Sequence, residues 1–157
     1  MKKKTTLAAL ATAILMTLLP VHSWASSCSL ASTAGNWAYS YTGTIFTQSG
    51  PLPAASVGHY HQDLAGSVSG SQTRSVAGNS GVEEISGTIS VNKNCTASAT
   101  IDVSVNGQLQ RTAVLALAFD SNENHWRMIF VSLTLPDGTN VPVVLSGDAN
   151  RMSFQED

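Results

Sequence analysis

The chain has 157 residues, of which 43% are hydrophobic and 11% charged, and its formal net charge is −2 at pH 7. This charge balance argues against a nucleic-acid partner, which a protein must hold through many phosphate contacts. The length fits one domain with a sizeable hydrophobic core.

The first 25 residues have the pattern of a secretory signal peptide. Lys2 to Lys4 form a positive start, Leu7 to Leu19 form an apolar segment of 13 residues, and Ser23-Trp24-Ala25 provides the small residues of a cleavage site. Thirteen apolar residues are too few to cross a bilayer as a helix, so no transmembrane segment is predicted. We expect cleavage after Ala25 in a bacterial cell, which leaves one secreted or periplasmic domain over residues 26–157.

Cleavage would also change the charge of the protein. It removes three of the eight basic residues and none of the ten acidic residues, so the remaining five basic and ten acidic residues give a net charge of −5. Lys93 is then the only lysine, and the four arginines are dispersed along the chain. Anionic membrane surfaces and nucleic acids are therefore poor partners for this domain.

The two cysteines, Cys28 and Cys95, predict a structural disulfide. An even number of cysteines in an oxidising compartment usually pairs, and neither residue belongs to a C-x-x-C motif. Such a bond would stabilise the fold by about 4 kcal/mol through the entropy of the unfolded chain. In an alternative interpretation Cys28 is acylated as in a lipoprotein, although such sites usually have leucine at the position of Ala25.

After residue 25 the sequence alternates between apolar and polar residues and has regular turn signals, which is typical of an all-β domain. The predicted strands cover residues 36–47, 55–62, 67–76, 82–92, 95–105, 108–119, 125–135 and 140–152. Asn106-Gly107 and Asp137-Gly138 predict tight turns, whereas residues 47–56 and 76–82 predict looser connections. Eight consecutive strands without helices favour an antiparallel up-and-down (meander) β-barrel, with an open sandwich as the alternative.

The turn at Asn106-Gly107 sets the expected register of the fifth and sixth strands. If it is a two-residue loop, Asp102 lies opposite Arg111 on the outer wall as an ion pair. The same register places three large apolar side chains on the outer wall: Leu115, Leu117 and Phe119. A wall facing water should not have this pattern, so either a bulge shifts the register or the wall packs against another subunit. The second explanation favours a homo-oligomer.

Aromatic side chains provide the candidate ligand contacts. Trp37, Tyr39 and Tyr41 share one face of the first strand, and Trp126 and Phe130 belong to the seventh. An eight-stranded barrel either fills its interior with side chains or encloses one small ligand. In the first case these rings are core residues, and in the second they line an apolar cavity with polar groups suited to a small hydrophobic molecule.

Two further patterns suggest chemistry. Glu83 is predicted to face the interior, where its pKa would rise unless an arginine met it; with Tyr39 or Tyr41 it is a candidate acid or base. The alternative places this glutamate in water at the barrel mouth. His59 and His61 share a strand face about 7 Å apart, a spacing that binds zinc or copper when a third ligand converges. Because nothing in the sequence brings such a ligand, two solvent-exposed histidines and no metal or cofactor are predicted.

Two resemblances to known families accompany these patterns. Gly35-x-Trp37 is similar to the lipocalin and calycin signature, in which a basic residue near the end of the last strand packs over the tryptophan; Arg151 occupies that place here. More broadly, the chain resembles a family of small, uncharacterised secreted bacterial proteins that are regarded as barrels similar to allene oxide cyclase and dirigent proteins. The matching elements are Cys28-Ser-Leu, Gly35-x-Trp-x-Tyr, Thr73-Arg74-Ser75, Gly87-Thr-Ile-Ser-Val-Asn92, Cys95-Thr and Asp137-Gly138. This resemblance implies a barrel and a dimer or trimer, and it transfers no catalytic residue.

The sequence therefore predicts a secreted, non-enzymatic barrel that binds a small hydrophobic ligand or a partner protein. The predicted ligand contacts are Trp37, Tyr39, Tyr41, Trp126, Phe130 and Arg151. One alternative is a cofactor-free isomerase or cyclase that works inside the barrel. Another is a structural envelope or matrix protein that self-associates through its outer wall.

Overall fold

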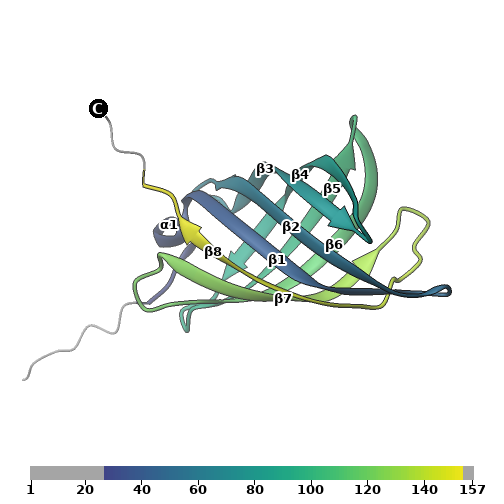
Figure 1. Ribbon diagram of the computed structural model, residues 1–157. Coiled ribbons are helices and arrows are strands. Elements are labelled where there is room, and N and C mark those ends of the chain that lie inside the picture. The colour runs from purple at the N-terminus through teal and green to yellow at the C-terminus, as the bar shows by residue number, and fades with distance from the viewer. Residues whose placement is uncertain (1–26, 154–157) are drawn as a thin grey trace, which may run out of the picture.

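A computed structural model describes residues 27–153, which form a closed antiparallel barrel (Figure 1). Each strand pairs with its neighbours in the chain, and β8 returns to pair with β1. The strands are β1 (Gly35–Thr47), β2 (Gly50–Gln62), β3 (Ser67–Val76), β4 (Asn79–Val91), β5 (Thr96–Val105), β6 (Gln108–Phe119), β7 (His125–Thr134) and β8 (Val143–Arg151). The predicted eight-stranded up-and-down barrel is confirmed. The predicted signal peptide and its cleavage site lie outside the described residues.

Two connections are tighter than the sequence suggested. β2 begins at Gly50, because Thr47 pairs with Gly50 and the hairpin continues past the two prolines of this segment. β4 begins at Asn79, directly after a turn formed by Ala77 and Gly78, whose φ angles are 48° and 87°. Two consecutive positive φ angles are typical of the two-residue turns that match the twist of a hairpin. Both segments therefore lengthen the barrel wall instead of forming loops.

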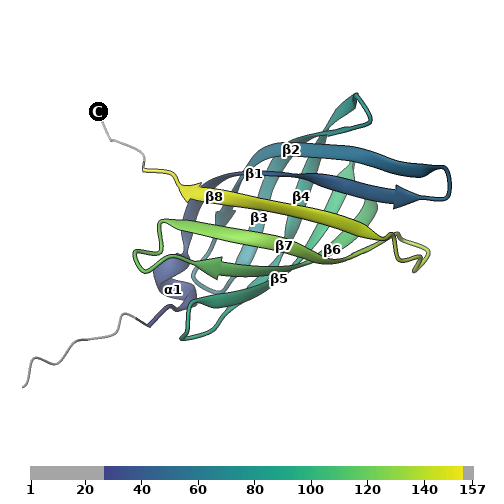
Figure 2. The same ribbon diagram turned by 60° about the horizontal axis from the view of Figure 1, so that its bottom comes forward.

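One short helix, α1 (Leu30–Thr33), precedes the barrel and was not predicted. Ser29 caps it, and the Ser29 and Ser32 side chains each hydrogen-bond the backbone N–H of the other residue, which forms a capping box. A helix of four residues leaves no detectable periodicity in a sequence. α1 lies at one end of the barrel, on the left in Figures 1 and 2. Among the described residues, no helix is long and apolar enough to cross a bilayer.

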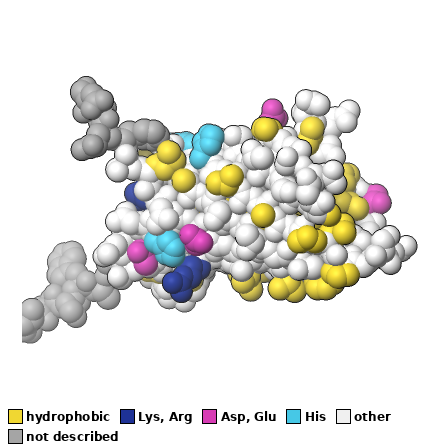
Figure 3. All heavy atoms as spheres, in the orientation of Figure 1, with side chains coloured by type: hydrophobic (Ala, Val, Ile, Leu, Met, Phe, Trp, Pro, Cys, Tyr) yellow, Lys and Arg dark blue, Asp and Glu magenta, His cyan; other side chains and the backbone are white. Residues whose placement is uncertain are grey.

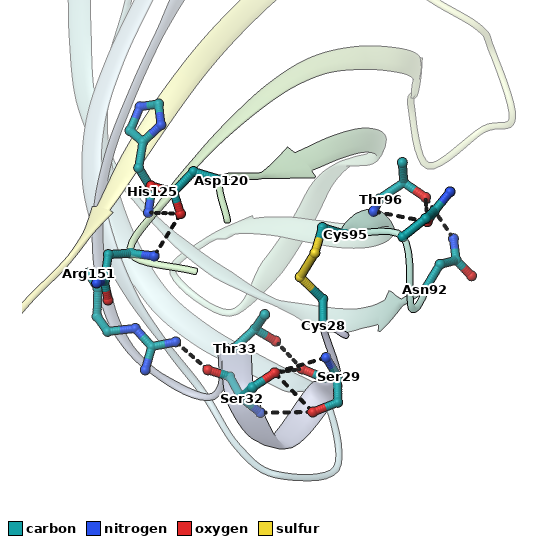
Figure 4. The surroundings of a disulfide bond; sticks show 12 residues. Cys28, Ser29, Ser32, Thr33, Asn92, Cys95, Thr96, Asp120, His125 and Arg151 are labelled. Atoms are coloured by element: carbon teal, nitrogen blue, oxygen red, sulfur yellow. Dashed lines mark hydrogen bonds between the residues drawn. A yellow bond between two sulfur atoms is a disulfide. The ribbon is translucent and has the colours of Figure 1, made fainter. Parts of the chain in front are cut away.

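The disulfide between Cys28 and Cys95 joins the segment before α1 to the start of β5 (Figure 4). This bond confirms the predicted pairing and argues against the alternative in which Cys28 is acylated. The α1 backbone is also tied to the barrel itself. Trp37 Nε1 donates to the Thr33 carbonyl at 3.1 Å, and the Arg151 guanidinium donates to the Ser32 carbonyl.

Aromatic side chains fill the barrel interior next to α1. Trp37 is fully buried, and its ring meets the Phe119 ring edge-on at 5.8 Å between centroids. Trp126 Nε1 donates to the Tyr60 hydroxyl at 2.8 Å. The Arg151 guanidinium lies 5.1 Å from the centre of the Trp37 ring, the arrangement expected of a cation–π contact. This end of the barrel is therefore closed by packed rings.

The register of β5 and β6 differs from the predicted one because the pair contains a β-bulge. The pairing shifts between Val103 and Ser104, so that Val103 lies opposite Arg111 and Asp102 lies opposite Thr112. The predicted outward ion pair between Asp102 and Arg111 is wrong: Asp102 accepts a hydrogen bond from Thr112 Oγ1 at 2.6 Å, and Arg111 faces the interior. The shift also moves three apolar side chains into the core, where their exposure is below 9%: Leu115, Leu117 and Phe119. The bulge, and not contact with a second subunit, explains the apolar pattern of β6.

Candidate functional site

The most polar part of the barrel interior is centred on Glu83 of β4. Its side chain is 6% exposed, and its carboxylate accepts two hydrogen bonds from the Arg111 guanidinium of β6, one of them 2.9 Å long. Arg74 Nε and Gln72 Nε2, both from β3, donate to the same carboxylate at 3.0 and 2.7 Å. The four donors fill the two oxygens of Glu83, so this buried charge is paired and fully hydrogen-bonded.

These contacts control the ionisation of Glu83. Burial raises the pKa of the carboxyl group, but the hydrogen bonds and positive charge of Arg111, assisted by Gln72 and Arg74, outweigh burial and lower the pKa to about 2. Glu83 is therefore ionised near neutral pH. It has no proton to donate there, and its low basicity makes it a poor proton acceptor.

Gln72 extends the network to β1 and β2. Its Oε1 accepts hydrogen bonds from the Tyr39 hydroxyl at 2.8 Å and from Ser56 Oγ at 3.0 Å. Burial, followed by the nearby negative groups, raises the pKa of Tyr39 well above its usual range, so the hydroxyl stays protonated and acts as a donor. Tyr39, Ser56, Gln72, Glu83 and the arginines thus form one connected polar network across the interior.

A cavity of about 60 Å³ lies beside this network. Its wall consists of four aromatic, six aliphatic and two polar side chains: Tyr39, Tyr41, Trp126 and Phe130; Ile85, Ile101, Val103, Ala113, Leu115 and Met128; Gln72 and Arg111. The Tyr41 and Phe130 rings meet edge-on at 5.1 Å between centroids. Phe130 is only partly buried, whereas Tyr39, Tyr41 and Trp126 are buried. An apolar wall with a few convergent polar groups is typical of small-molecule sites.

Four of the six predicted ligand contacts line this cavity, namely Tyr39, Tyr41, Trp126 and Phe130. Trp37 and Arg151 do not; they pack against each other at the end closed by α1. The candidate acid or base, Glu83, is not in water at the barrel mouth, as the alternative interpretation proposed, but is buried and paired with arginine.

The sequence interpretation missed Gln72, Arg74 and Arg111 as site residues. Gln72 and Arg74 share the inward face of the third strand with Val68, so the period of two could have identified them. Arg111 could not be found in this way, because the bulge in β5 and β6 reverses the face expected from the turn at Asn106-Gly107.

His59 and His61 lie on the outer wall of β2 and are exposed. The Nδ1 atom of His61 is 3.1 Å from the Asn36 side-chain oxygen. Within residues 27–153 no group of three or more histidine, cysteine, aspartate or glutamate side chains is placed to hold a metal ion. The structure therefore provides no third ligand for the histidine pair.

The chain matches no protein-family profile and no curated protein sequence. It is similar in fold to a solved structure described as EF1p2_mFAP2b bound to DFHBI, with a TM-score of 0.52 and 14% sequence identity. The similarity covers 77% of this chain and 94% of that chain. At this level of identity the comparison shows a shared fold and nothing about shared chemistry.

Proposed function

We propose that the protein is a secreted or periplasmic barrel that binds a small, largely apolar ligand in its interior cavity. The cavity lined by Tyr41, Phe130 and Arg111 carries this proposal. It combines an aromatic and aliphatic wall with a buried polar network. The structural neighbour is bound to the small molecule DFHBI, which supports ligand binding as a use of this architecture.

The volume of the cavity limits the ligand. A cavity of about 150 Å³ encloses benzene, and this one measures about 60 Å³. A ligand therefore contributes only a group of a few atoms to the cavity as it stands. The rest of a larger ligand would extend past Phe130 towards solvent.

The isomerase or cyclase alternative has less support. An enzyme of that kind needs an acid or base whose pKa lies near the working pH, whereas arginine pairing holds the pKa of Glu83 at about 2. Tyr39 is a hydrogen-bond donor to Gln72 and stays protonated. Both groups are suited to orienting a bound molecule rather than to transferring protons.

Mass spectrometry of the exported protein tests the proposal. Ala113 lines the cavity, so Ala113→Val fills part of it, whereas Ala116→Val makes the same change on the opposite face of β6. We expect an additional organic mass under native conditions in the wild type and in Ala116→Val, and its loss in Ala113→Val. The proposal is contradicted if the native spectra of all three proteins are the same after correction for the substitutions.

The outer wall supports a second candidate function, self-association. Ile129 and Val131 of β7 and Val144 of β8 are 57, 61 and 69% exposed. Figure 3 shows hydrophobic side chains along the lower edge of the molecule, where Figure 1 places β7 and β8. Large exposed apolar patches mark interaction surfaces more often than single exposed residues do.

The oligomeric state tests this second candidate. Val131→Lys introduces a charge into the patch, and Val57→Lys makes the same change at a residue of β2 that is 63% exposed. Self-association predicts a mass that rises with concentration in sedimentation for the wild type and Val57→Lys, but not for Val131→Lys. A monomer at all concentrations in the wild type excludes it.

A further inference from the structure

Building on the proposed function, we infer that the group which enters the interior cavity is an anion, and specifically the carboxylate of a small organic acid. The observation is an imbalance of charge around the buried Glu83 carboxylate, next to the cavity; Arg111 lines the cavity, and Arg74 lies outside its lining. Arg74 and Arg111 contribute two positive charges, and Glu83 is the only carboxylate among the described residues that forms an ion pair with either of them. One positive charge is therefore left over.

The two arginines also offer more hydrogen-bond donors than the Glu83 carboxylate can accept. A carboxylate has about four acceptor positions, and Glu83 already accepts four bonds. Each guanidinium has five N–H donors; Arg111 gives two of them to Glu83 and Arg74 gives one. Glu83 therefore has no capacity for further donors, while both arginines retain donors that it does not accept.

The second arginine is not needed to stabilise Glu83. Arg111 binds the carboxylate with two hydrogen bonds and Gln72 adds a third, so the buried charge is paired without Arg74. Arg74 places its charge in the same cluster, although its side chain is 25% exposed and could have extended fully into water. In a domain with an expected net charge of −5, a local excess of positive charge is most simply explained by a negatively charged ligand.

The geometry favours a carboxylate over other anions. Arg111 forms part of the cavity wall, next to Tyr41, which interacts with its guanidinium. Arginine recognises planar carboxylates through paired hydrogen bonds, and these bonds are stronger where water is excluded. The cavity holds only a few atoms, so a carboxylate group that carries one or two further carbons fills it, and the apolar wall formed by Met128 and Phe130 contacts those carbons.

Methyl NMR of methionine tests this inference, because Met128 lines the cavity and Met152 lies outside it at 37% exposure. The probes are propionate and propionamide, which have nearly the same shape and differ in charge, at constant ionic strength. We expect propionate to shift the Met128 methyl signal in a saturable way with at least tenfold higher affinity than propionamide. The Met152 signal should stay in place and serves as the internal reference.

Substitutions at Arg74 and Arg127 distinguish the effect of the Arg74 charge from the effect of removing any arginine. We expect Arg74→Gln to weaken propionate binding at least fivefold and to leave propionamide binding unchanged, with partial recovery in Arg74→Lys. Arg127→Gln removes an exposed arginine from the outer wall of β7 and should change neither affinity.

The outcomes distinguish this inference from the proposed function. Equal affinity for propionate and propionamide, or an Arg74→Gln protein that binds propionate as well as the wild type does, overturns the anion inference and leaves the proposed function standing. A Met128 signal that responds to neither compound contradicts both.

Discussion

Replacing Glu83 by glutamine should strongly destabilise the barrel. The substitution keeps the shape of the side chain but removes the carboxylate that, within residues 27–153, pairs with Arg111, whose side chain is 8% exposed. Removing one member of a buried ion pair costs about 3–5 kcal/mol, because the other charge stays buried without a partner. Lowering the pKa of Glu83 from its ordinary 4.5 to about 2 corresponds to about 3 kcal/mol at most, which agrees with this range.

Urea unfolding, followed by tryptophan fluorescence, measures the effect. Trp37 and Trp126 are 0 and 2% exposed, so their emission reports loss of the core. We expect Glu83→Gln to lower the free energy of unfolding by about 3 kcal/mol or more. Arg111→Met should lower it by less, because Arg74 still pairs with Glu83. The double variant should lose much less than the sum, because no unpaired charge remains at the pair. A loss below about 1 kcal/mol for Glu83→Gln, or additive losses in the double variant, refutes the reasoning.

The same pair sets the response to acid. Because folding lowers the pKa of Glu83, its contribution to stability is fully present above the unfolded pKa of 4.5 and disappears as the pH falls towards about 2. The free energy of unfolding of the wild type should therefore decrease more steeply over this interval than that of Glu83→Gln. Parallel pH profiles for the two proteins would show that Glu83 does not titrate in this way.

Three further predictions concern the wall and the closed end of the barrel. Replacing Cys28 and Cys95 by alanine should cost about 4 kcal/mol through the entropy of the unfolded chain, seen as a lower urea midpoint; an unchanged midpoint would contradict the account. Gly43 has a φ angle of 151°, and a Cβ atom there would lie 2.0 Å from the Val144 carbonyl oxygen, so Gly43→Ala should lose about 1–3 kcal/mol in thermal unfolding. Equal melting temperatures would mean that β1 and β8 do not approach so closely. Leu115→Lys should prevent folding, because the side chain is inside the barrel. A variant that circular dichroism shows to be folded would instead support the outward orientation of Leu115 expected from the sequence.

Much of the fold could be predicted because its determinants are local. Alternation along each strand depends on the period of two, and the turn at Asn106-Gly107 is encoded by residues that adopt positive φ angles. The aromatic face of the first strand followed from the same rule, and its Tyr39 and Tyr41 side chains do line the cavity.

The polar network could not be predicted because it depends on contacts across strands. Glu83, Gln72 and Arg111 come from three different strands, and their contacts depend on the register between β5 and β6. A single bulge residue changes which face Arg111 occupies, and alternation within one strand contains no information about it. The volume of the cavity is similarly inaccessible, because it depends on strand tilt and stagger as well as on side-chain size.

A high-resolution crystal structure of the exported protein, purified without refolding, tests the central claim most directly. The account predicts electron density for a bound organic molecule that contacts Arg111, Tyr41 and Phe130 inside the barrel. A cavity that contains only water, or that is filled by a rotated side chain, would contradict the proposed ligand-binding function.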